Sequence, residues 1–268
     1  MLSAFALRFI YRARCWYERV WLGRPNRSLV RYLPFDFVIK ANSNRGAHEA
    51  DVLRYIRSHT TIPVPRVYWS AQDSDSTYTL MKRVDGSILE ARWPRFDDIQ
   101  RTRIVAQLRA YVGQLRDLQP THSNSLAVCG LGNTPCNDGR VSSMPFGPFD
   151  DEAGFNDHLI RAAELYLADE ILNDIRASMT DDHRICFTHG DLTPRNIIVR
   201  DDGTIAAVID WEYAGWYPEY WETVKALYCT MVVKDDRWDK AVRDFIPGNY
   251  ERELQIDKSL SDRMVGAF

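Results

Sequence analysis

Three polar side chains stand at fixed intervals in the second half of the chain: Asp191, Asn196 and Asp210. Asn196 precedes the apolar run 197–199, and Asp210 follows a second apolar run, 205–209. An Asp-Gly pair lies between the runs, and this is the strongest local signal for a hairpin. Because an antiparallel hairpin brings the start of one strand beside the end of the other, Asn196 and Asp210 are expected to converge. Their amide and carboxylate oxygens suit a hard cation such as magnesium.

The same residues belong to a longer pattern, in which His189-Gly190-Asp191 is followed by Asn196 and then by Asp210. This order and spacing is the catalytic signature of the kinase-like fold. There the first Asp orients or deprotonates the attacking hydroxyl, while the Asn and the second Asp hold magnesium on the nucleotide phosphates. The alternative is a polar loop before an ordinary surface hairpin, which requires type, order and spacing to match by chance.

The form of this pattern resembles the aminoglycoside phosphotransferase family of small-molecule kinases rather than the protein kinases. Three further segments resemble the version common in fungal members: Ile62-Pro63-Val64-Pro65, Gly147-Pro148-Phe149 and Tyr217-Pro218-Glu219-Tyr220-Trp221-Glu222. The resemblance covers about residues 28 to 255. It implies an α+β, bilobal, protein-kinase-like fold with a small antiparallel-sheet lobe and a mainly helical lobe. It also implies ATP and magnesium as cofactors, a hydroxyl of a small molecule as acceptor, and Asp210-Trp211-Glu212 as the metal-binding stretch.

The first half of the chain carries the residues that this fold uses to position phosphates. Lys40 ends the apolar stretch 37–40, which is expected to be a strand, and Glu49 stands nine residues later in a helical segment. A strand lysine paired with a helix glutamate is the phosphate-positioning ion pair of kinases. A lone Lys and Glu would mean little, so this prediction depends on the 191–210 pattern.

The hinge between the lobes is expected at residues 82–86. By position in the resembled fold, the nucleotide base would contact Met81, Lys82 and Val84. One departure precedes this segment, because no Gly occurs between Gly23 and Gly46, where protein kinases carry a Gly-rich loop. Residues 32–36 are expected to take its place.

Arg195 lies four residues after Asp191. Its position matches the arginine of the tyrosine-kinase catalytic loop, which would offset charge near the transferred phosphoryl group. A structural pairing of Arg195 with Glu212 or Glu219 is the alternative. His189 is expected to brace the catalytic loop, and a zinc site at His189 and Asp191 lacks further suitable ligands nearby.

The predicted lobes are residues 1–85 and 86–268. The Arg-rich segment at about 1–24 has apolar residues near helical spacing: Phe5, Phe9, Trp16 and Val20. We expect a helix packed on the first lobe, with an acid-poor transit peptide as the alternative. Apolar periodicity predicts further helices at 96–118, 155–179 and 218–231.

Composition bounds the class of protein. The chain has 268 residues, of which 45 % are apolar and 26 % charged, as in ordinary globular proteins. No apolar run approaches the length of roughly 18 residues that a membrane span needs, so no membrane is expected as a partner. No nucleic acid is expected as a partner either. The five Cys residues show neither paired nor metal-type spacing, which favours a reducing, cytoplasmic compartment. The oligomeric state is not predicted.

Charge is unevenly spread along the chain. Residues 1–149 hold 21 Lys and Arg against 12 Asp and Glu, a net +9, whereas residues 150–268 hold 13 against 25, a net −12. The acidic half predicts an amine-bearing acceptor, with a cation–π contact from Trp238. The aspartates expected beside it are Asp235, Asp236, Asp239 and Asp244. An acidic surface that serves solubility alone is the alternative.

Three functions are open to a chain of this pattern, and the leading one is a magnesium- and ATP-dependent small-molecule phosphotransferase. The second is a kinase-fold binding module that has lost phosphoryl transfer, since fold alone does not establish activity. The missing Gly loop supports it, and the intact set opposes it: Lys40, Glu49, Asp191, Asn196 and Asp210. The third is a protein kinase, but the Trp-Tyr-Pro-Glu stretch begins six residues after Asp210, which leaves no room for an activation segment.

Overall fold

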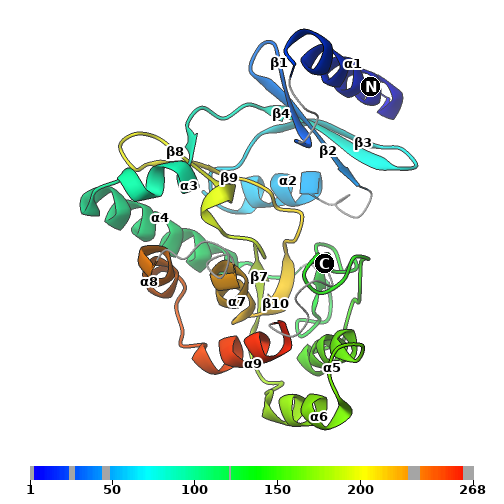
Figure 1. The fold of residues 1–268 in the computed structure, drawn as a ribbon, viewed down its shortest axis with the longest axis vertical. Coiled ribbons are helices and arrows are strands. Elements are labelled where there is room, and N and C mark those ends of the chain that lie inside the picture. The colour runs from blue at the N-terminus through cyan, green and yellow to red at the C-terminus, as the bar shows by residue number, and fades with distance from the viewer. Residues whose placement is uncertain (1–2, 24–27, 44–48, 121, 229–235, 262–268) are drawn as a thin grey trace. The chain divides into compact units, whose positions relative to one another are not determined.

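A computed structural model describes residues 3–23, 28–43, 49–120, 122–228 and 236–261. It divides into two compact units: residues 1–94 with 195–212, and residues 95–194 with 213–268. The first unit contains a four-stranded antiparallel sheet and the second is mainly helical, so the predicted fold class is confirmed (Figure 1). Among the described residues, no helix is both long and apolar enough to span a membrane.

The first unit is built on the sheet β1-β2-β4-β3, in which every neighbouring pair is antiparallel. A second sheet has the order β5-β8-β9. The elements of this unit are α1 (Ala4–Trp21), β1 (Val30–Leu33), β2 (Phe37–Ser43), α2 (Glu49–His59), β3 (Val67–Gln72), β4 (Ser76–Lys82), β5 (Ser87–Ile88), α3 (Leu89–Arg92), β8 (Ile197–Val199) and β9 (Ile205–Val208).

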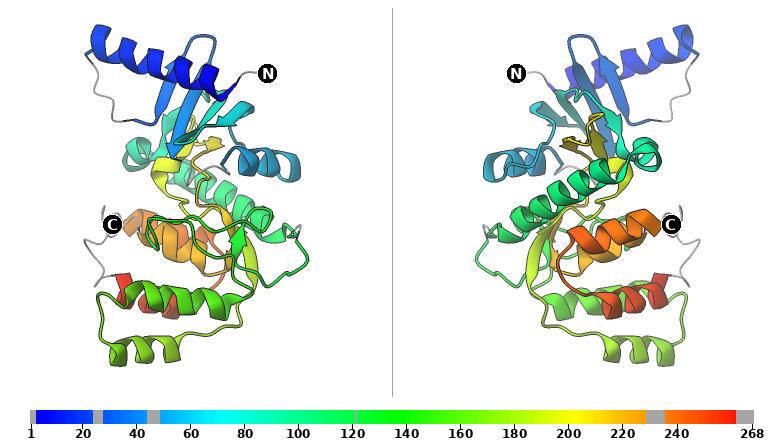
Figure 2. Two further views of the ribbon diagram at one scale, coloured as in Figure 1. Left: turned by 90° about the vertical axis from the view of Figure 1, so that its right-hand side faces the viewer. Right: turned by 90° about the vertical axis from the view of Figure 1, so that its left-hand side faces the viewer.

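Strand β2 serves both faces of the four-stranded sheet, because successive side chains of a strand point to opposite faces. Ile39 and Ala41 join Leu7 of α1 in a buried cluster on one face. Val38 and Lys40 point to the other face, where Lys40 bonds Glu49 at the start of α2. In both views of Figure 2, α1 lies against the sheet. The side chains on one face of β2 therefore belong to a core, and the other face carries Lys40, a predicted site residue.

The second unit surrounds a short sheet of order β6-β10-β7. Its elements are α4 (Asp98–Asp117), β6 (Cys129–Gly130), α5 (Glu152–Ala163), α6 (Asp169–Ser178), β7 (Ile185–Thr188), β10 (Gly215–Pro218), α7 (Trp221–Tyr228), α8 (Asp236–Phe245) and α9 (Glu251–Ser261). Two 3-10 turns, Trp93–Arg95 and Pro194–Asn196, lie where the chain passes between the units. The helix predicted at 155–179 is two helices, α5 and α6.

Aromatic side chains form the core of the second unit. Phe155 of α5 makes edge contacts with Tyr217 of β10 and Trp221 of α7, at centroid distances of 5.8 and 5.0 Å. Phe187 of β7 packs edge-on against Trp216 at 5.1 Å. Rings of this size bury 150–250 Å² each, so they hold the short sheet against its helices.

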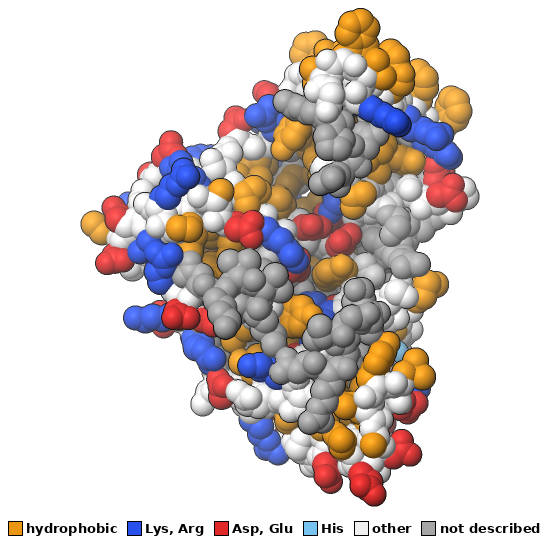
Figure 3. All heavy atoms as spheres, viewed as in Figure 1, with side chains coloured by type: hydrophobic (Ala, Val, Ile, Leu, Met, Phe, Trp, Pro, Cys, Tyr) orange, Lys and Arg blue, Asp and Glu red, His pale blue; other side chains and the backbone are white. Residues whose placement is uncertain are grey.

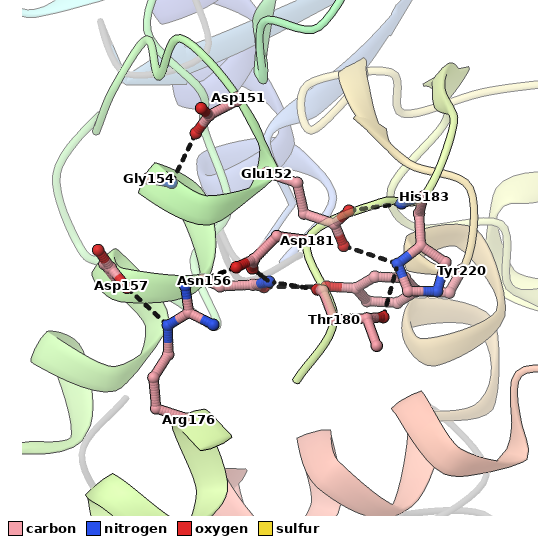
Figure 4. Close-up of polar contacts among 10 residues, drawn as sticks. All are labelled: Asp151, Glu152, Gly154, Asn156, Asp157, Arg176, Thr180, Asp181, His183 and Tyr220. Carbon is pink, nitrogen blue, oxygen red and sulfur yellow. Dashed lines mark hydrogen bonds and ion pairs between the residues drawn. The ribbon is translucent and has the colours of Figure 1, made fainter. Parts of the chain in front are cut away.

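A polar network fixes the segment that leads into β7 (Figure 4). Glu152, at the start of α5, accepts the backbone N–H of His183 and lies 2.8 Å from its ring Nδ1. Asn156 donates to the carbonyl of Thr180 at 2.9 Å and accepts the hydroxyl of Tyr220 at 3.3 Å. The start of β7 and the start of α7 are thereby tied to the same helix, α5.

Candidate functional site

The first unit contains a cavity of ≈ 270 Å³. Its walls are mostly apolar, with a few polar side chains, as is typical of small-molecule sites. Apolar side chains come from both sheets of the unit: Val30, Val38, Met81, Val84, Ile88, Ile198 and Ile209. The charged side chains are Lys40, Glu49, Lys82, Arg83 and Asp210. All five predicted nucleotide-binding residues (Lys40, Glu49, Met81, Lys82 and Val84) line this one cavity.

Lys40 makes two ion pairs at the wall of the cavity. Its Nζ lies 2.8 Å from Oε2 of Glu49 and 2.6 Å from Oδ1 of Asp210. Burial lowers the pKa of Lys40, but the carboxylates of Glu49, Asp210 and Glu212 outweigh it and hold that pKa above its ordinary value. Burial raises the pKa of Glu49, and the Lys40 ammonium opposes this effect. The predicted strand-to-helix ion pair is present in the structure.

Asn196 and Asp210 flank the predicted hairpin, which is present as β8 and β9 with Ile197 opposite Val208. The backbone carbonyl of Asn196 accepts the N–H of Ile209 at 2.9 Å, which places Asn196 beside the segment that carries Asp210. Asp210 has a φ of 66°, an uncommon backbone conformation for a residue other than Gly. Strain of this kind concentrates at functional sites, and here it falls on the residue that meets Lys40.

Asn42, a residue that the sequence analysis did not single out, bonds two carboxylates beside the cavity. Asn42 donates from Nδ2 to Glu49 at 2.9 Å and to Glu212 at 3.0 Å. Asn42 lies two positions after Lys40 on β2 and so points to the same face of the sheet. That alternation was the available signal, although it could not reveal that the amide joins a helix to the end of a hairpin.

Only part of the expected hinge has free backbone donors. The N–H of Lys82 bonds the carbonyl of Arg66 at 2.9 Å, and the N–H of Arg83 bonds that of Asp36 at 2.7 Å. No described residue takes the N–H of Val84. Of the two hinge positions predicted to contact the base, Lys82 and Val84, only Val84 has an N–H that no described backbone acceptor takes and that can therefore serve a ligand.

The stretch expected to replace a Gly-rich loop is the β1–β2 turn. Phe35 and Asp36 have φ values of 61° and 57°, so two non-glycine residues adopt the left-handed conformation that such a turn favours. Asp36 is tied to Arg83 through its carbonyl, as described above. Tyr32, at the base of the turn, lines the cavity and lies under the Arg83 guanidinium, 5.3 Å from its ring centroid. The turn is tight and anchored despite the absence of Gly.

Asp191 belongs to the second unit, in a buried loop after β7. Its N–H donates to Nδ1 of the fully buried His189 at 3.1 Å, so His189 braces the loop as expected. Gly190 has a φ of 77°, and a Cβ there would lie 2.7 Å from the carbonyl oxygen of Tyr213. The position before Asp191 therefore accepts only Gly without rearrangement.

Glu222 of α7 accepts hydrogen bonds from the backbone of this loop, a role that the sequence analysis missed. Its Oε2 accepts the N–H of His189 at 2.6 Å, and the N–H of Gly190 also bonds this carboxyl. Burial raises the pKa of Glu222 to about 7, and the two backbone N–H groups and Arg116 oppose the shift. An acid in the first turn of a helix packed with aromatic residues was the available signal.

The remaining predicted residues of the described chain do not line the cavity of the first unit. Arg195 is exposed, in the 3-10 turn before β8. Trp238 is 2 % exposed and packs on Phe245, so the predicted cation–π contact with an acceptor is wrong. The reason is that α8 turns this ring into the core rather than outwards. Asp235 lies outside the described residues, and Asp236 and Asp239 lie in the first turn of α8.

Lys40, Asn196 and Asp210 are arranged so that they can bind a polyanion together with a metal cation. In the described residues no cluster of three or more His, Cys, Asp or Glu side chains could hold a metal alone. Magnesium is usually bound by one or two carboxylates together with phosphate oxygens, so Asn196 and Asp210 fit that mode.

A family model described as the phosphotransferase enzyme family matches residues 20–254. No curated protein matches the chain in sequence. Three solved structures illustrate the shared fold. An aminoglycoside-3'-phosphotransferase of type VIII is 18 % identical, with a TM-score of 0.58 over 88 % of this chain and 89 % of that one.

The second structure, the gentamicin complex of APH(2'')-IIa, is 14 % identical, with a TM-score of 0.59 over 94 % of this chain and 84 % of that one. The third, the aminoglycoside phosphotransferase APH(3'')-Id from Streptomyces rimosus with ADP and streptomycin, is 17 % identical, with a TM-score of 0.51 over 84 % and 87 %.

Proposed function

Because the chain belongs to the phosphotransferase enzyme family, we propose that it transfers the γ-phosphate of ATP, with magnesium, to a hydroxyl of a small molecule. One observation carries the proposal: a single cavity of the first unit holds Lys40 between the carboxylates of Glu49 and Asp210. Such a lysine neutralises phosphate charge, and the carboxylate that faces it can hold a metal ion.

The cavity suggests how the nucleotide would be held. The base would lie among the apolar walls and accept the N–H of Val84, while Lys40 would contact the phosphates. Asn196 and Asp210 would bind magnesium, which when present neutralises the charge that develops on the transferred group. Lys40 would then exchange its bond to Asp210 for a phosphate oxygen, and Glu49 would keep it in place.

Asp191 would serve the acceptor. The acceptor oxygen bonds to the γ-phosphorus, the bond to the leaving ADP oxygen breaks, and the hydroxyl proton passes to the Asp191 carboxylate. Arg195 would offset charge on the transferred group. The bonds from His189 and Glu222 fix the loop backbone, so Asp191 is positioned before the acceptor arrives.

The acceptor is proposed to be a hydroxylated small molecule. Two of the structures with the same fold hold gentamicin or streptomycin, and one of them holds ADP. A protein acceptor is disfavoured, since β10 begins at Gly215 and α7 at Trp221, which leaves no segment for peptide docking after Asp210. The cytoplasmic location stays a prediction from cysteine usage.

Turnover and binding together test the proposal. The protein is incubated with ATP, magnesium and a panel of hydroxylated metabolites, and mass spectrometry detects an added phosphate. Asp191→Asn should lose two to four decades of rate, roughly the contribution of a general base, and should still bind ATP. Retention of more than about a tenth of the rate would contradict the role of Asp191.

Calorimetry separates the metal site from the acceptor side. Asp210→Ala should lose the magnesium dependence of ATP binding. Asp201→Asn, on the turn of the same hairpin with a carboxylate 90 % exposed, is the matched control and should behave as wild type. ATP binding without transfer to any acceptor would favour the binding-module alternative.

A further inference from the structure

Helix α1 has two apolar faces, and the four-stranded sheet covers one of them. Leu7 is fully buried against the sheet, together with the partly buried Ile10 and Tyr11. Arg8 also reaches Asp73 at 3.1 Å. These contacts hold the helix on the sheet, so its opposite face is presented on a fixed scaffold.

The opposite face carries large exposed apolar side chains. Phe5 is 79 % exposed, Phe9 66 %, Trp16 60 % and Val20 56 %. At 3.6 residues per turn these four positions share one side of the helix. Figure 3 shows the apolar side chains gathered at the upper end of the view, over α1. The sequence predicted that this stripe belongs to a helix on the first lobe, but the sheet is contacted through another face.

The charges on this face have one sign. Arg12 and Arg19 fall on the same stripe by helical spacing, are exposed, and have no ion-pair partner among the described residues. The helix has one acidic residue, Glu18, which is 8 % exposed and pairs with Arg14 and Arg31. The outer face is therefore aromatic and basic, and carries no acidic side chain.

From this charge and shape we propose that the outer face of α1 docks on an anionic lipid surface. Aromatic and apolar residues on one side, flanked by arginines, are the features of helices that lie in the membrane interface. Arginines near such a surface are attracted by anionic headgroups. A second copy fits less well, because pairing two α1 faces would bring Arg12 and Arg19 of both copies together without an acid to neutralise them.

The expectation of no membrane partner rested on the lack of an apolar run long enough to span a membrane, and that lack does not exclude a helix that lies in the membrane interface. A helix in the interface needs only one apolar face, and the 18 residues of α1 extend over about 27 Å from the rise per residue. The proposal is independent of phosphoryl transfer, since none of these side chains lines the cavity.

Vesicle co-sedimentation of the full chain tests it. The two preparations are phosphatidylcholine alone and phosphatidylcholine mixed with phosphatidylserine. Wild type should sediment with the anionic vesicles and much less with the neutral ones, and added salt should weaken the binding. Replacing Phe5, Phe9 and Trp16 by Ser should reduce the vesicle partition coefficient at least about tenfold.

Matched variants control for the number of exposed apolar groups and for charge. Ser at Ile99, Leu126 and Leu165, which are 74 %, 60 % and 89 % exposed elsewhere, should leave binding unchanged. Arg12→Gln with Arg19→Gln should weaken it about tenfold, whereas Arg57→Gln with Arg95→Gln should not. ATP binding should be the same in all these variants, which confirms that they fold.

Four results would overturn the proposal. One is a lack of sedimentation with anionic vesicles, and another is binding that survives the three Ser substitutions. The third is self-association, measured by analytical ultracentrifugation, that the Ser substitutions abolish while vesicles have no effect, because a second copy would then cover the face. Binding of a soluble polyanion such as heparin, without binding to vesicles, would likewise exclude a lipid surface.

Discussion

Lys40 is held by two carboxylates with different surroundings. Glu49 is almost fully buried, with 5 % of its side chain exposed, whereas the side chain of Asp210 is 37 % exposed. The first bond is therefore protected from solvent, and the second is open to exchange with a ligand. Removing one partner of a buried pair leaves the other charge unpaired, which typically costs more than the pair itself contributes.

Lys40→Met should therefore damage both stability and function. The free energy of unfolding should fall by about 3 kcal/mol, since Glu49 stays buried without its cation. The double variant Lys40→Met/Glu49→Gln should regain most of the stability but no phosphoryl transfer. Urea unfolding and turnover are measured in parallel.

Lys82→Met is the matched control for that series, because Lys82 is an exposed lysine that also lines the cavity. Its unfolding free energy should stay within about 0.5 kcal/mol of wild type. If the double variant were as unstable as Lys40→Met, the buried charge of Glu49 would not explain the loss.

Glu222 makes the stability of the loop that carries Asp191 depend on pH. Burial raises its pKa from 4.5 to about 7 in the folded chain, so between these values the folded chain binds more protons than the unfolded chain. The free energy of unfolding contributed by this group must then fall as pH rises from about 4.5 to 7, and the fall ends above the folded pKa. Its total is on the order of 3 kcal/mol, since one pKa unit corresponds to 1.36 kcal/mol.

Glu222→Gln should remove this pH dependence. The difference in unfolding free energy between wild type and variant, measured by urea at pH 5, 6, 7 and about 8, should shift against the wild type as pH rises. Glu251→Gln provides the comparison, since its carboxyl is exposed and its pKa is lowered by Gln255 and Arg243. A difference that stays constant over this pH range would contradict the raised pKa.

At the scale of elements, local signals predicted the hairpin well and the helices less well. The Asp-Gly pair between β-branched runs specifies β8 and β9 because the turn chemistry and the strand pattern agree. No such signal separates α5 from α6, since residues 164–168 contain neither Gly nor Pro. Apolar periodicity also could not tell which of the two apolar faces of α1 packs on the sheet. These failures concern tertiary packing, which local pattern does not encode.

The loop that carries Asp191 gives a prediction at this scale. Gly190→Ala combines a positive φ with a Cβ only 2.7 Å from a backbone oxygen, so the loop must move. The expected loss is about 3 kcal/mol of unfolding free energy, together with most of the turnover.

Two other glycines separate the causes of that loss. Gly132 has a φ of 72° with nothing near its missing Cβ, so Gly132→Ala should cost only about 1 kcal/mol. Gly113, in the helix α4, has open space, so Gly113→Ala should stabilise by roughly 0.5–1 kcal/mol. Equal losses at Gly190 and Gly132 would mean that contact with Tyr213 plays no part.

At the scale of the whole molecule, the first unit is assembled from two distant parts of the chain. Residues 1–94 supply the sheet and α2, and residues 195–212 supply the hairpin that completes the cavity. Sequence could predict this assembly only through the catalytic pattern, because no local signal relates Lys40 to Asp210 across 170 positions. Asn42 and Glu222 were missed for the same reason, since their partners are remote in sequence.

A ligand held by both parts should stabilise the first unit as one cooperative body. Neither part can leave the cavity without releasing the nucleotide, so binding free energy adds to the unfolding free energy. At a nucleotide concentration 100 times the dissociation constant the gain is about 2.7 kcal/mol, equivalent to a melting temperature rise on the order of 10 °C for a unit of this size. Differential scanning calorimetry with ATP and magnesium should therefore show the transition of the first unit at a higher temperature. Asp210→Asn should reduce the shift to the value seen with EDTA, and Asp201→Asn should keep it. A transition of the first unit that ATP and magnesium leave at the same temperature would contradict a nucleotide held by both parts of that unit.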